Sequence, residues 1–323
     1  MEKVSIIIPC RDIGSMAIDC IRACLNLDYD DFEIIVLPDE TNKKSKNPKL
    51  KIIETGKVKP SFKRNKGMEV AEGDFYAFID DDAYPRKDWL KKAMNHFKND
   101  YNKKIGIVGG PNLTPPDANF AEKVSGYVSS NFWVSGPANI RYKISKNRYT
   151  EELPSCNYIS RKEASSEYDS CFLTAEDSRF CFICRKRGYK VLYSKDVIVY
   201  HHRRKSLWKH LKQHYIFGRD IAWLTKKEFS FSMLFYAIMT LFVIGFLTGF
   251  IWSFFDSMIR MIFIYLLEFY LIVMLLTSLH ENVKTSFYVF IVSIETHFVY
   301  GFGYLIGIFS GPEKTEKVIW NSR

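Results

Sequence analysis

Apolar and polar residues alternate in short blocks over the first two thirds of this 323-residue chain. Compact apolar runs between polar residues, such as VSIIIP and FEIIVL, are typical of buried strands. Between them, apolar residues recur at helical spacing. The predicted strands are 4–9, 32–37, 50–53, 74–79, 104–109 and 190–200, and the predicted helices are 14–27, 61–71, 86–98 and 176–188. This alternation predicts an α/β domain with a mostly parallel sheet, interrupted by a loop-rich, aromatic stretch at 111–153.

The pattern changes after Lys227, where charged residues almost vanish. Three segments are apolar and long enough to span a bilayer, at about 231–254, 260–279 and 286–309. Because they follow one another with very short links, we predict an α-helical membrane domain of about three transmembrane helices. The third contains Gly301, Gly303 and Gly307, a face of small residues that suits close helix packing. Its His297 either holds helices together, which we prefer, or lines a groove for a lipid phosphate.

The stretch before these segments, residues 206–228, is amphipathic and basic and contains tryptophan. We interpret it as an interfacial helix on the membrane, the alternative being an ordinary surface helix. Its lysines place this side of the membrane in the cytoplasm. Three spans would then put Lys314, Lys317 and Arg323 outside, against the positive-inside rule. Either the tail lies outside against that preference, or one segment is re-entrant.

Composition narrows the class of partner. The formal net charge of +10 is compatible with nucleic acid or with an anionic membrane surface. The basic residues concentrate beside the apolar segments, so we expect a membrane and no nucleic acid. Seven cysteines and no apparent signal peptide predict free thiols in the cytosol. Cys181 and Cys184 have CxxC spacing, but without a second pair they are more typical of a helix than of a zinc site.

Three consecutive acids, Asp80–Asp82, follow the apolar strand predicted at 74–79. Three carboxylates side by side repel one another unless a cation lies among them. In open α/β sheets, ligands bind where strands end. The cluster therefore suggests a divalent metal that serves a phosphate-bearing substrate, while a solvated loop or a helix N-cap remains the alternative.

The stretch from Lys63 to Leu90 contains KRNKG, AEGD and FIDDDAYP in order. It resembles the nucleotide-sugar site of family 2 glycosyltransferases with the GT-A fold. Other elements of the resemblance are SIIIP at residues 5–9, Asp39, Glu176-Asp177, and Gly188-Tyr189-Lys190-Val191 leading to His201-His202. It covers about residues 4–205. We therefore expect a GT-A (Rossmann-like) domain at 1–205, an interfacial helix at 206–228, transmembrane helices at 229–310 and a tail at 311–323.

The resemblance implies roles for individual residues. Asp82 would ligate Mg²⁺ or Mn²⁺ between the two phosphates of the donor, and Asp80 would contact the ribose or the metal. One of His201 and His202 would approach the metal, and we assign His202. The expected donor-binding residues are Pro9, Arg11, Asp39, Arg64, Asp80 and Glu176. Asp39 would bind the base, the alternative being a solvated turn, and Arg64 would lie near the base or phosphates, the alternative being a surface cation.

Asp177 is the candidate general base, because an attacking hydroxyl must lose a proton to a nearby carboxylate. The alternative is a pair of acids that interact with a helix dipole. One base with in-line attack predicts inversion at the anomeric carbon.

We therefore expect a metal-dependent inverting glycosyltransferase at the plasma membrane, with its catalytic domain in the cytoplasm. A nucleotide sugar would be the donor, and a polyprenyl phosphate or lipid-linked glycan the acceptor. Such an enzyme would serve cell-surface glycan or glycoprotein synthesis. The alternatives are a processive polysaccharide synthase and a non-catalytic membrane scaffold. Residues 213–220 lack the QxxRW-type motif that such synthases usually carry.

Overall fold

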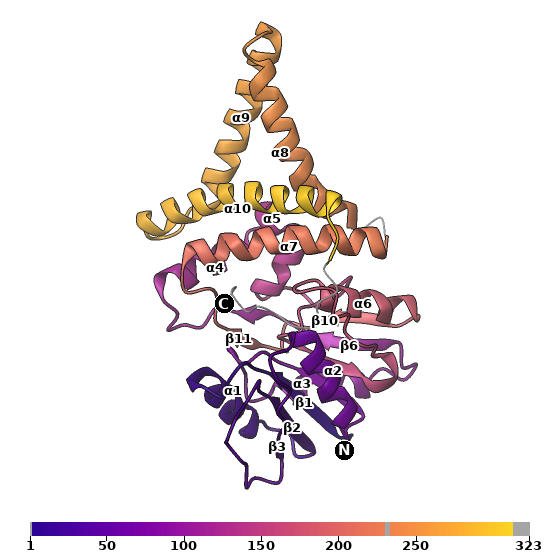
Figure 1. The fold of residues 1–323 in the computed structure, drawn as a ribbon. Coiled ribbons are helices and arrows are strands. Elements are labelled where there is room, and N and C mark those ends of the chain that lie inside the picture. Colours follow the sequence, from indigo (N-terminus) through magenta and orange to yellow (C-terminus); the bar gives the residue numbers. More distant parts are fainter. Residues whose placement is uncertain (1, 230–232, 313–323) are drawn as a thin grey trace. The chain divides into compact units, whose positions relative to one another are not determined.

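The computed structural model of this protein describes residues 2–229 and 233–312. These residues form two compact units (Figure 1). The first contains the described residues up to Asp117, together with Ile140–His202. The second contains Ala118–Asn139 and the described part of Arg203–Pro312. A single boundary near residue 205 therefore does not describe the chain, because residues 118–139 belong with the C-terminal helices.

The first unit is built on an eight-stranded, mostly parallel sheet, as the sequence predicts. In spatial order the strands are β3 (Leu50–Ile52), β2 (Phe32–Leu37), β1 (Val4–Pro9), β4 (Phe75–Phe78), β9 (Tyr158–Arg161), β6 (Ile105–Gly109), β10 (Lys190–Tyr193) and β8 (Arg148–Thr150). Parallel pairs join β1 to β2 and β4, β2 to β3, and β6 to β10. β9 runs antiparallel to both of its neighbours, β4 and β6, and β8 runs antiparallel to β10.

Helices cover both faces of this sheet, which is why its strands are apolar without alternation. Ile6 and Ile8 of β1 point into one core, which α1 (Ser15–Leu25) and α3 (Trp89–Lys98) complete. Ile7 points into the opposite core, which α2 (Pro60–Val70) and α6 (Glu176–Lys186) complete. Cys181 and Cys184 lie buried in α6 as free thiols, so the interpretation of this pair as helix residues is confirmed.

A second, three-stranded sheet places residues of the candidate site. It has the order β5 (Ala83–Pro85), β11 (Val199–His201) and β7 (Asn112–Leu113). The single strand predicted at 190–200 is in fact two strands, β10 and β11. Residues 194–198 separate them, and a turn closes there with the Val197 N–H donating to the Ser194 carbonyl at 3.3 Å.

The second unit is helical. α8, α9 and α10 are long and apolar enough to cross a membrane by length and composition. Its helices are α4 (Phe120–Ser130), α5 (Phe132–Ser135), α7 (Leu207–Lys227), α8 (Leu234–Trp252), α9 (Ser257–Thr277) and α10 (Val283–Phe309), and the short 3₁₀ helices of the chain are η1 (Gly136–Tyr142) and η2 (Lys162–Ala164).

α4 lies in the stretch that we expected to be loop-rich. Asn119 and Glu122 form a capping box at its start: each side chain accepts a hydrogen bond from the other residue's backbone N–H. This Asn-x-x-Glu spacing was the sequence signal for the helix. Val124 and Val128 of α4 pack in one buried cluster with Val289 and Val292 of α10. This packing explains why the segment belongs to the second unit.

Gly303 and Gly307 of α10 pack against α7 and Gly301 packs against α8, which confirms the prediction of close packing. A Cβ atom on Gly303 would lie 2.1 Å from the Tyr215 carbonyl oxygen, and one on Gly307 would lie 2.5 Å from the Arg219 carbonyl oxygen. On the α7 side, a Cβ on Gly218 would lie 2.2 Å from the Tyr300 carbonyl oxygen. The two backbones are therefore in direct contact, which only glycine permits at these positions.

We predict that Gly303→Ala destabilises the second unit by about 1–3 kcal/mol, because the added methyl group meets backbone that must move. Gly245→Ala in α8 is the matched control, since a Cβ there has no atom within 4 Å. Thermal unfolding of the detergent-solubilised protein measures both. Equal transition temperatures for the two variants would contradict the packing described here.

Candidate active site

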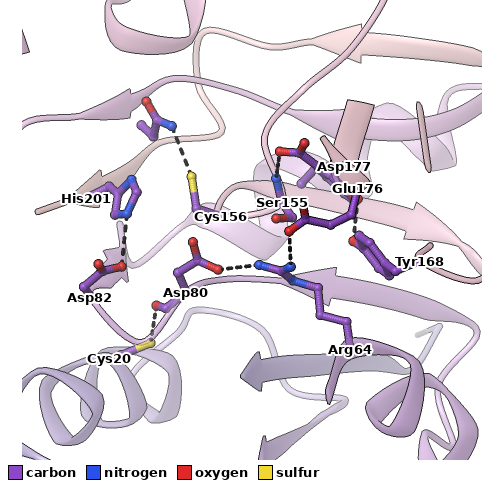
Figure 2. Close-up of polar contacts among 12 residues, drawn as sticks. Cys20, Arg64, Asp80, Asp82, Ser155, Cys156, Tyr168, Glu176, Asp177 and His201 are labelled. Atoms are coloured by element: carbon purple, nitrogen blue, oxygen red, sulfur yellow. Dashed lines mark hydrogen bonds and ion pairs between the residues drawn. The ribbon is translucent and has the colours of Figure 1, made fainter. Parts of the chain in front are cut away.

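The acidic cluster lies in the turn between β4 and β5. The Ala83 N–H donates to the Asp80 carbonyl at 3.1 Å and closes this turn. β5 then pairs with β11 in a register that sets His201 opposite Ala83. This ladder brings the imidazole of His201 to Asp82, with 3.0 Å between Nε2 and Oδ1 (Figure 2). Two strands more than a hundred residues apart in the sequence thus assemble one site.

Asp80, Asp82 and His201 can each offer a ligand atom within 4.8 Å of the others. Two carboxylates with one imidazole form a donor set that suits Mn²⁺ and also accepts Mg²⁺. The structure brings His201 into this group, and not His202, which we had assigned to the metal. The backbone N–H of His202 donates to the Asp82 carbonyl at 2.9 Å, and its ring centroid lies 6.4 Å from that of Tyr84.

Arg64 links the acidic cluster to the Glu176-Asp177 pair. Its guanidinium lies 2.7 Å from Asp80 Oδ1 and 3.0 Å from Glu176 Oε1 (Figure 2). The residue is only 3% exposed, so it is not a surface cation. Burial alone would lower the pKa of Arg64, but Asp80 and Glu176 raise it well above its usual value. Arg64 is therefore a fixed positive charge between the two acidic groups.

Glu176 and Asp177 begin α6, where Glu176 is buried and Asp177 is half-buried. Burial, reinforced by the charge of Asp177, raises the pKa of Glu176 to about 8, although Arg64 opposes the shift. Burial likewise raises the pKa of Asp177 to about 6. Asp177 accepts hydrogen bonds from the backbone N–H groups of Ser155 (3.2 Å) and Ser178 (2.8 Å). These two bonds fix the orientation of its carboxylate.

Asp39 lies beside the first loop, and it is buried and not a solvated turn residue. Its carboxylate pairs with Lys63, whose Nζ also donates to the Cys10 carbonyl at 2.7 Å. The Asp39 N–H donates to the Arg11 carbonyl at 2.9 Å, and Pro9 ends the adjacent strand β1. The structure thus gathers Pro9, Arg11 and Asp39 at one place, as the sequence interpretation requires.

Lys63 is a site residue that sequence reasoning missed. It stands next to Arg64 in the KRNKG stretch, and no role was assigned to it. Its side chain is 1% exposed and holds the ends of β1 and β2 together. Its partners Cys10, Leu37 and Asp39 are distant in the sequence, so no local pattern reports its burial.

The charges of the site are partly balanced within the chain. Arg64 faces Asp80, and His201 faces Asp82. Burial lowers the pKa of His201, but the Cys156 thiol and Asp82 together raise it to about 10. Asp80, Asp82 and His201 form a donor set that fits a divalent cation, which would take the place of the His201–Asp82 contact.

The family model that matches residues 5–168 is described as glycosyl transferase family 2. The chain belongs to this family. The match covers β1, the acidic turn and Tyr168, and it ends before Glu176 and Asp177. Membership makes the protein a glycosyltransferase.

Two relatives have curated names. One is the dolichyl N-acetyl-alpha-D-glucosaminyl phosphate 3-beta-D-2,3-diacetamido-2,3-dideoxy-beta-D-glucuronosyltransferase of Methanococcus voltae, 24% identical over 76% of this chain and 79% of that protein. The other is the GalNAc(5)-diNAcBac-PP-undecaprenol beta-1,3-glucosyltransferase of Campylobacter jejuni subsp. jejuni serotype O:2, 26% identical over 39% of this chain. The second alignment spans 43% of that relative.

Among solved structures, the mannosyltransferase PcManGT from Pyrobaculum calidifontis, in complex with GDP-Man and Mn²⁺, matches with a TM-score of 0.50 and 14% identity. The match covers 68% of this chain and 62% of that protein. This likeness supports the GT-A-like fold of the first unit.

We predict that Arg64→Met lowers the free energy of unfolding by about 3–5 kcal/mol, because it leaves Asp80 and Glu176 without the charge between them. Arg22→Met is the control, since Arg22 pairs with Asp19 on the surface and such pairs contribute about 0–1 kcal/mol. Urea denaturation in detergent measures both variants. A loss at Arg64 no larger than that at Arg22 would contradict the role given to the buried pair.

Proposed function

We propose that this glycosyltransferase is membrane-anchored, metal-dependent and inverting, and that it transfers a sugar from a nucleotide-sugar donor to a lipid-linked acceptor. The observation that carries the proposal is the chain of contacts from His201 and Asp82, beside Asp80, through Arg64 to Glu176. It connects a cation-binding group of residues to a buried acidic pair within the first unit.

The donor would bind with its diphosphate at the acidic turn and its base at Asp39. Asp80, Asp82 and His201 would hold Mg²⁺ or Mn²⁺, which would supply positive charge for the leaving diphosphate. Pro9, Arg11 and Asp39 would surround the base, because the carboxyl ends of β1 and β2 bring them together. Arg64, the fixed cation beside Asp80, would keep Asp80 ionised and orient it, and Glu176 would hold Arg64 in place from the other side.

Asp177 would act as the general base. Its carboxylate would accept the proton of the acceptor hydroxyl while that oxygen attacks the anomeric carbon. The backbone N–H groups of Ser155 and Ser178 hold the carboxylate in one orientation. A single base with attack from the face opposite the leaving group gives inversion. The raised pKa of Asp177 makes it a stronger base than an exposed aspartate, while it remains mostly ionised at pH 7.

The nature of the acceptor rests on two observations. The chain has three apolar helices of membrane length. Two of the curated relatives carry names that refer to a lipid-linked glycan, with dolichyl phosphate in one and undecaprenol diphosphate in the other. A polyprenyl phosphate or a lipid-linked glycan therefore fits best. The lysines at both ends of α7 favour a cytoplasmic catalytic domain at the plasma membrane.

We predict that sugar transfer depends on the ionised form of Asp177. Because its pKa is raised to about 6, the rate should be near its maximum at pH 7 and should fall as the pH drops through 6 and the carboxylate is protonated. Asp177→Asn should lower the rate by about 10²–10⁴-fold without loss of donor affinity. A panel of nucleotide sugars with a lipid-phosphate acceptor provides the assay. An Asn variant that transfers sugar at the wild-type rate would refute the assignment.

We predict that transfer stops in the presence of a chelator and returns with Mn²⁺ or Mg²⁺. Asp82→Asn should weaken metal-dependent donor binding more than Asp81→Asn does, because Asp81 is not part of the group that can share a cation. Isothermal titration of the nucleotide with and without metal compares the two variants, which lose the same charge. Donor binding that is insensitive to the chelator would rule out the metal. Separately, the length of the product distinguishes single transfer from processive synthesis.

A further inference from the structure

α7 and α10 lie side by side and run in the same direction. The contacts between them advance together along both helices, over about 13 residues or about 20 Å of α7. The successive pairs are His210 with Thr296, Gly218 with Tyr300, Arg219 with Gly307, and Trp223 with Ser310. At the first pair, 3.1 Å separates His210 Nε2 from Thr296 Oγ1. Any orientation that α10 takes in a membrane is therefore shared by α7.

α7 cannot cross a hydrocarbon core at low cost. It carries Lys209 and Lys212 near its start and Lys226 and Lys227 at its end. Arg219 and Asp220 stand midway between these groups, where a spanning helix would be at the centre of the bilayer. Ionisable side chains at that depth are expensive. A helix with charges at both ends and in its middle belongs instead at the interface, with its axis in the membrane plane.

α8 and α9 are different. In the most apolar 18-residue stretch of each helix, 11% of the residues of α8 and 6% of those of α9 are buried within the protein, against 44% for α10. Their contacts with α10 are local. Thr240 of α8 donates to the Gly301 carbonyl at 3.1 Å, and the Phe242 ring lies 6.0 Å from that of His297. Residues of α8 thus meet a short segment of α10, and Figure 1 shows the α8–α9 hairpin crossing α10 and not following it.

The residues at the far end of the hairpin are of the types found where proteins meet the headgroup layer of a membrane. Trp252 is exposed there. Asp256 caps α9 with hydrogen bonds from the Met258 and Ile259 N–H groups, and Arg260 donates to the Ser253 carbonyl at 2.8 Å. An aromatic residue with charged neighbours is typical of the headgroup layer. α8 and α9, with 19 and 21 residues, are about 28–32 Å long, which matches a core of about 30 Å.

We propose that the chain crosses the bilayer twice, through α8 and α9, and that α7 and α10 lie as a parallel pair in the interface on one side. This goes beyond the proposed function, because it concerns the membrane and no chemical step. It replaces the expectation of three spans. Gly311 then lies on the same side as Arg203, where the chain enters this unit. Lys314, Lys317 and Arg323, for which three spans conflicted with the positive-inside rule, lie outside the described residues.

Two variants of the full chain, each with one added cysteine, test this arrangement. Gly311→Cys follows α10, where an added Cβ has no atom within 4 Å, and Ser257→Cys lies exposed at the tip of the hairpin. All seven native cysteines lie between Cys10 and Cys184, so the unmodified protein gives the background. Each variant is expressed in bacterial cells and treated with a membrane-impermeant maleimide, in intact spheroplasts and in inverted membrane vesicles.

Two crossings predict opposite results for the two positions. Ser257→Cys should react in spheroplasts and Gly311→Cys only in inverted vesicles, each by at least 10-fold over the other preparation. Reaction of both variants in spheroplasts would establish a third crossing and overturn the proposal. A Ser257→Cys variant that does not react in spheroplasts would overturn it as well. Reporter fusions after Arg323 give an independent measurement. Green fluorescent protein fused there should fluoresce, and alkaline phosphatase fused there should be inactive. The reverse result would refute the in-plane pair.

Discussion

The architecture of the candidate site depends on one buried positive charge. Arg64 is held between Asp80 and Glu176, which come from the end of β4 and the start of α6. A buried guanidinium without partners would be costly, and Asp80 and Glu176 both accept hydrogen bonds from it. The same charge limits the repulsion within the acidic turn. It also offsets part of the cost of placing Glu176 and Asp177 together in the interior. The contacts of Arg64 therefore both stabilise the fold and arrange the acidic residues of the candidate site.

The small second sheet has a comparable role at the other end of the site. The antiparallel pairing of β5 with β11 fixes the distance between Asp82 and His201, because a register shift of one residue would turn the imidazole to the opposite face. Tyr84 and Tyr200 stack across the same ladder, with 5.2 Å between ring centroids, and this reinforces the register. The position of His201 relative to Asp82 therefore depends on backbone hydrogen bonds between two strands.

The sequence predicted β1–β4, β6, α1–α3 and α6 of the first unit, because apolar runs and helical spacing are local signals. It did not predict the short strands β5, β7 and β8 or the central strand β9. It also identified Asp80, Asp82, Arg64, Asp39 and the Glu176-Asp177 pair, which the structure brings into two neighbouring groups. It did not distinguish His201 from His202, since that choice depends on the register between β5 and β11. The burial of Lys63 and the transfer of residues 118–139 to the helical unit depend on tertiary packing, and hydrophobic periodicity does not report such contacts.

The parallel pairing of α7 with α10 also sets an order of events while the protein is synthesised. His210 and its partner Thr296 are 86 residues apart, a separation that takes about 4–17 s to translate at roughly 5–20 residues per second. During this interval His210 and Gly218 of α7 have no α10 to pack against, and α8 and α9 are synthesised before α10 is complete. In the proposed arrangement, the hairpin can therefore enter the bilayer before α7 and α10 pair. α10 is the last helix to be made, and a chain that stops before it would keep the α8–α9 hairpin but would leave α7 without the helix that packs against it.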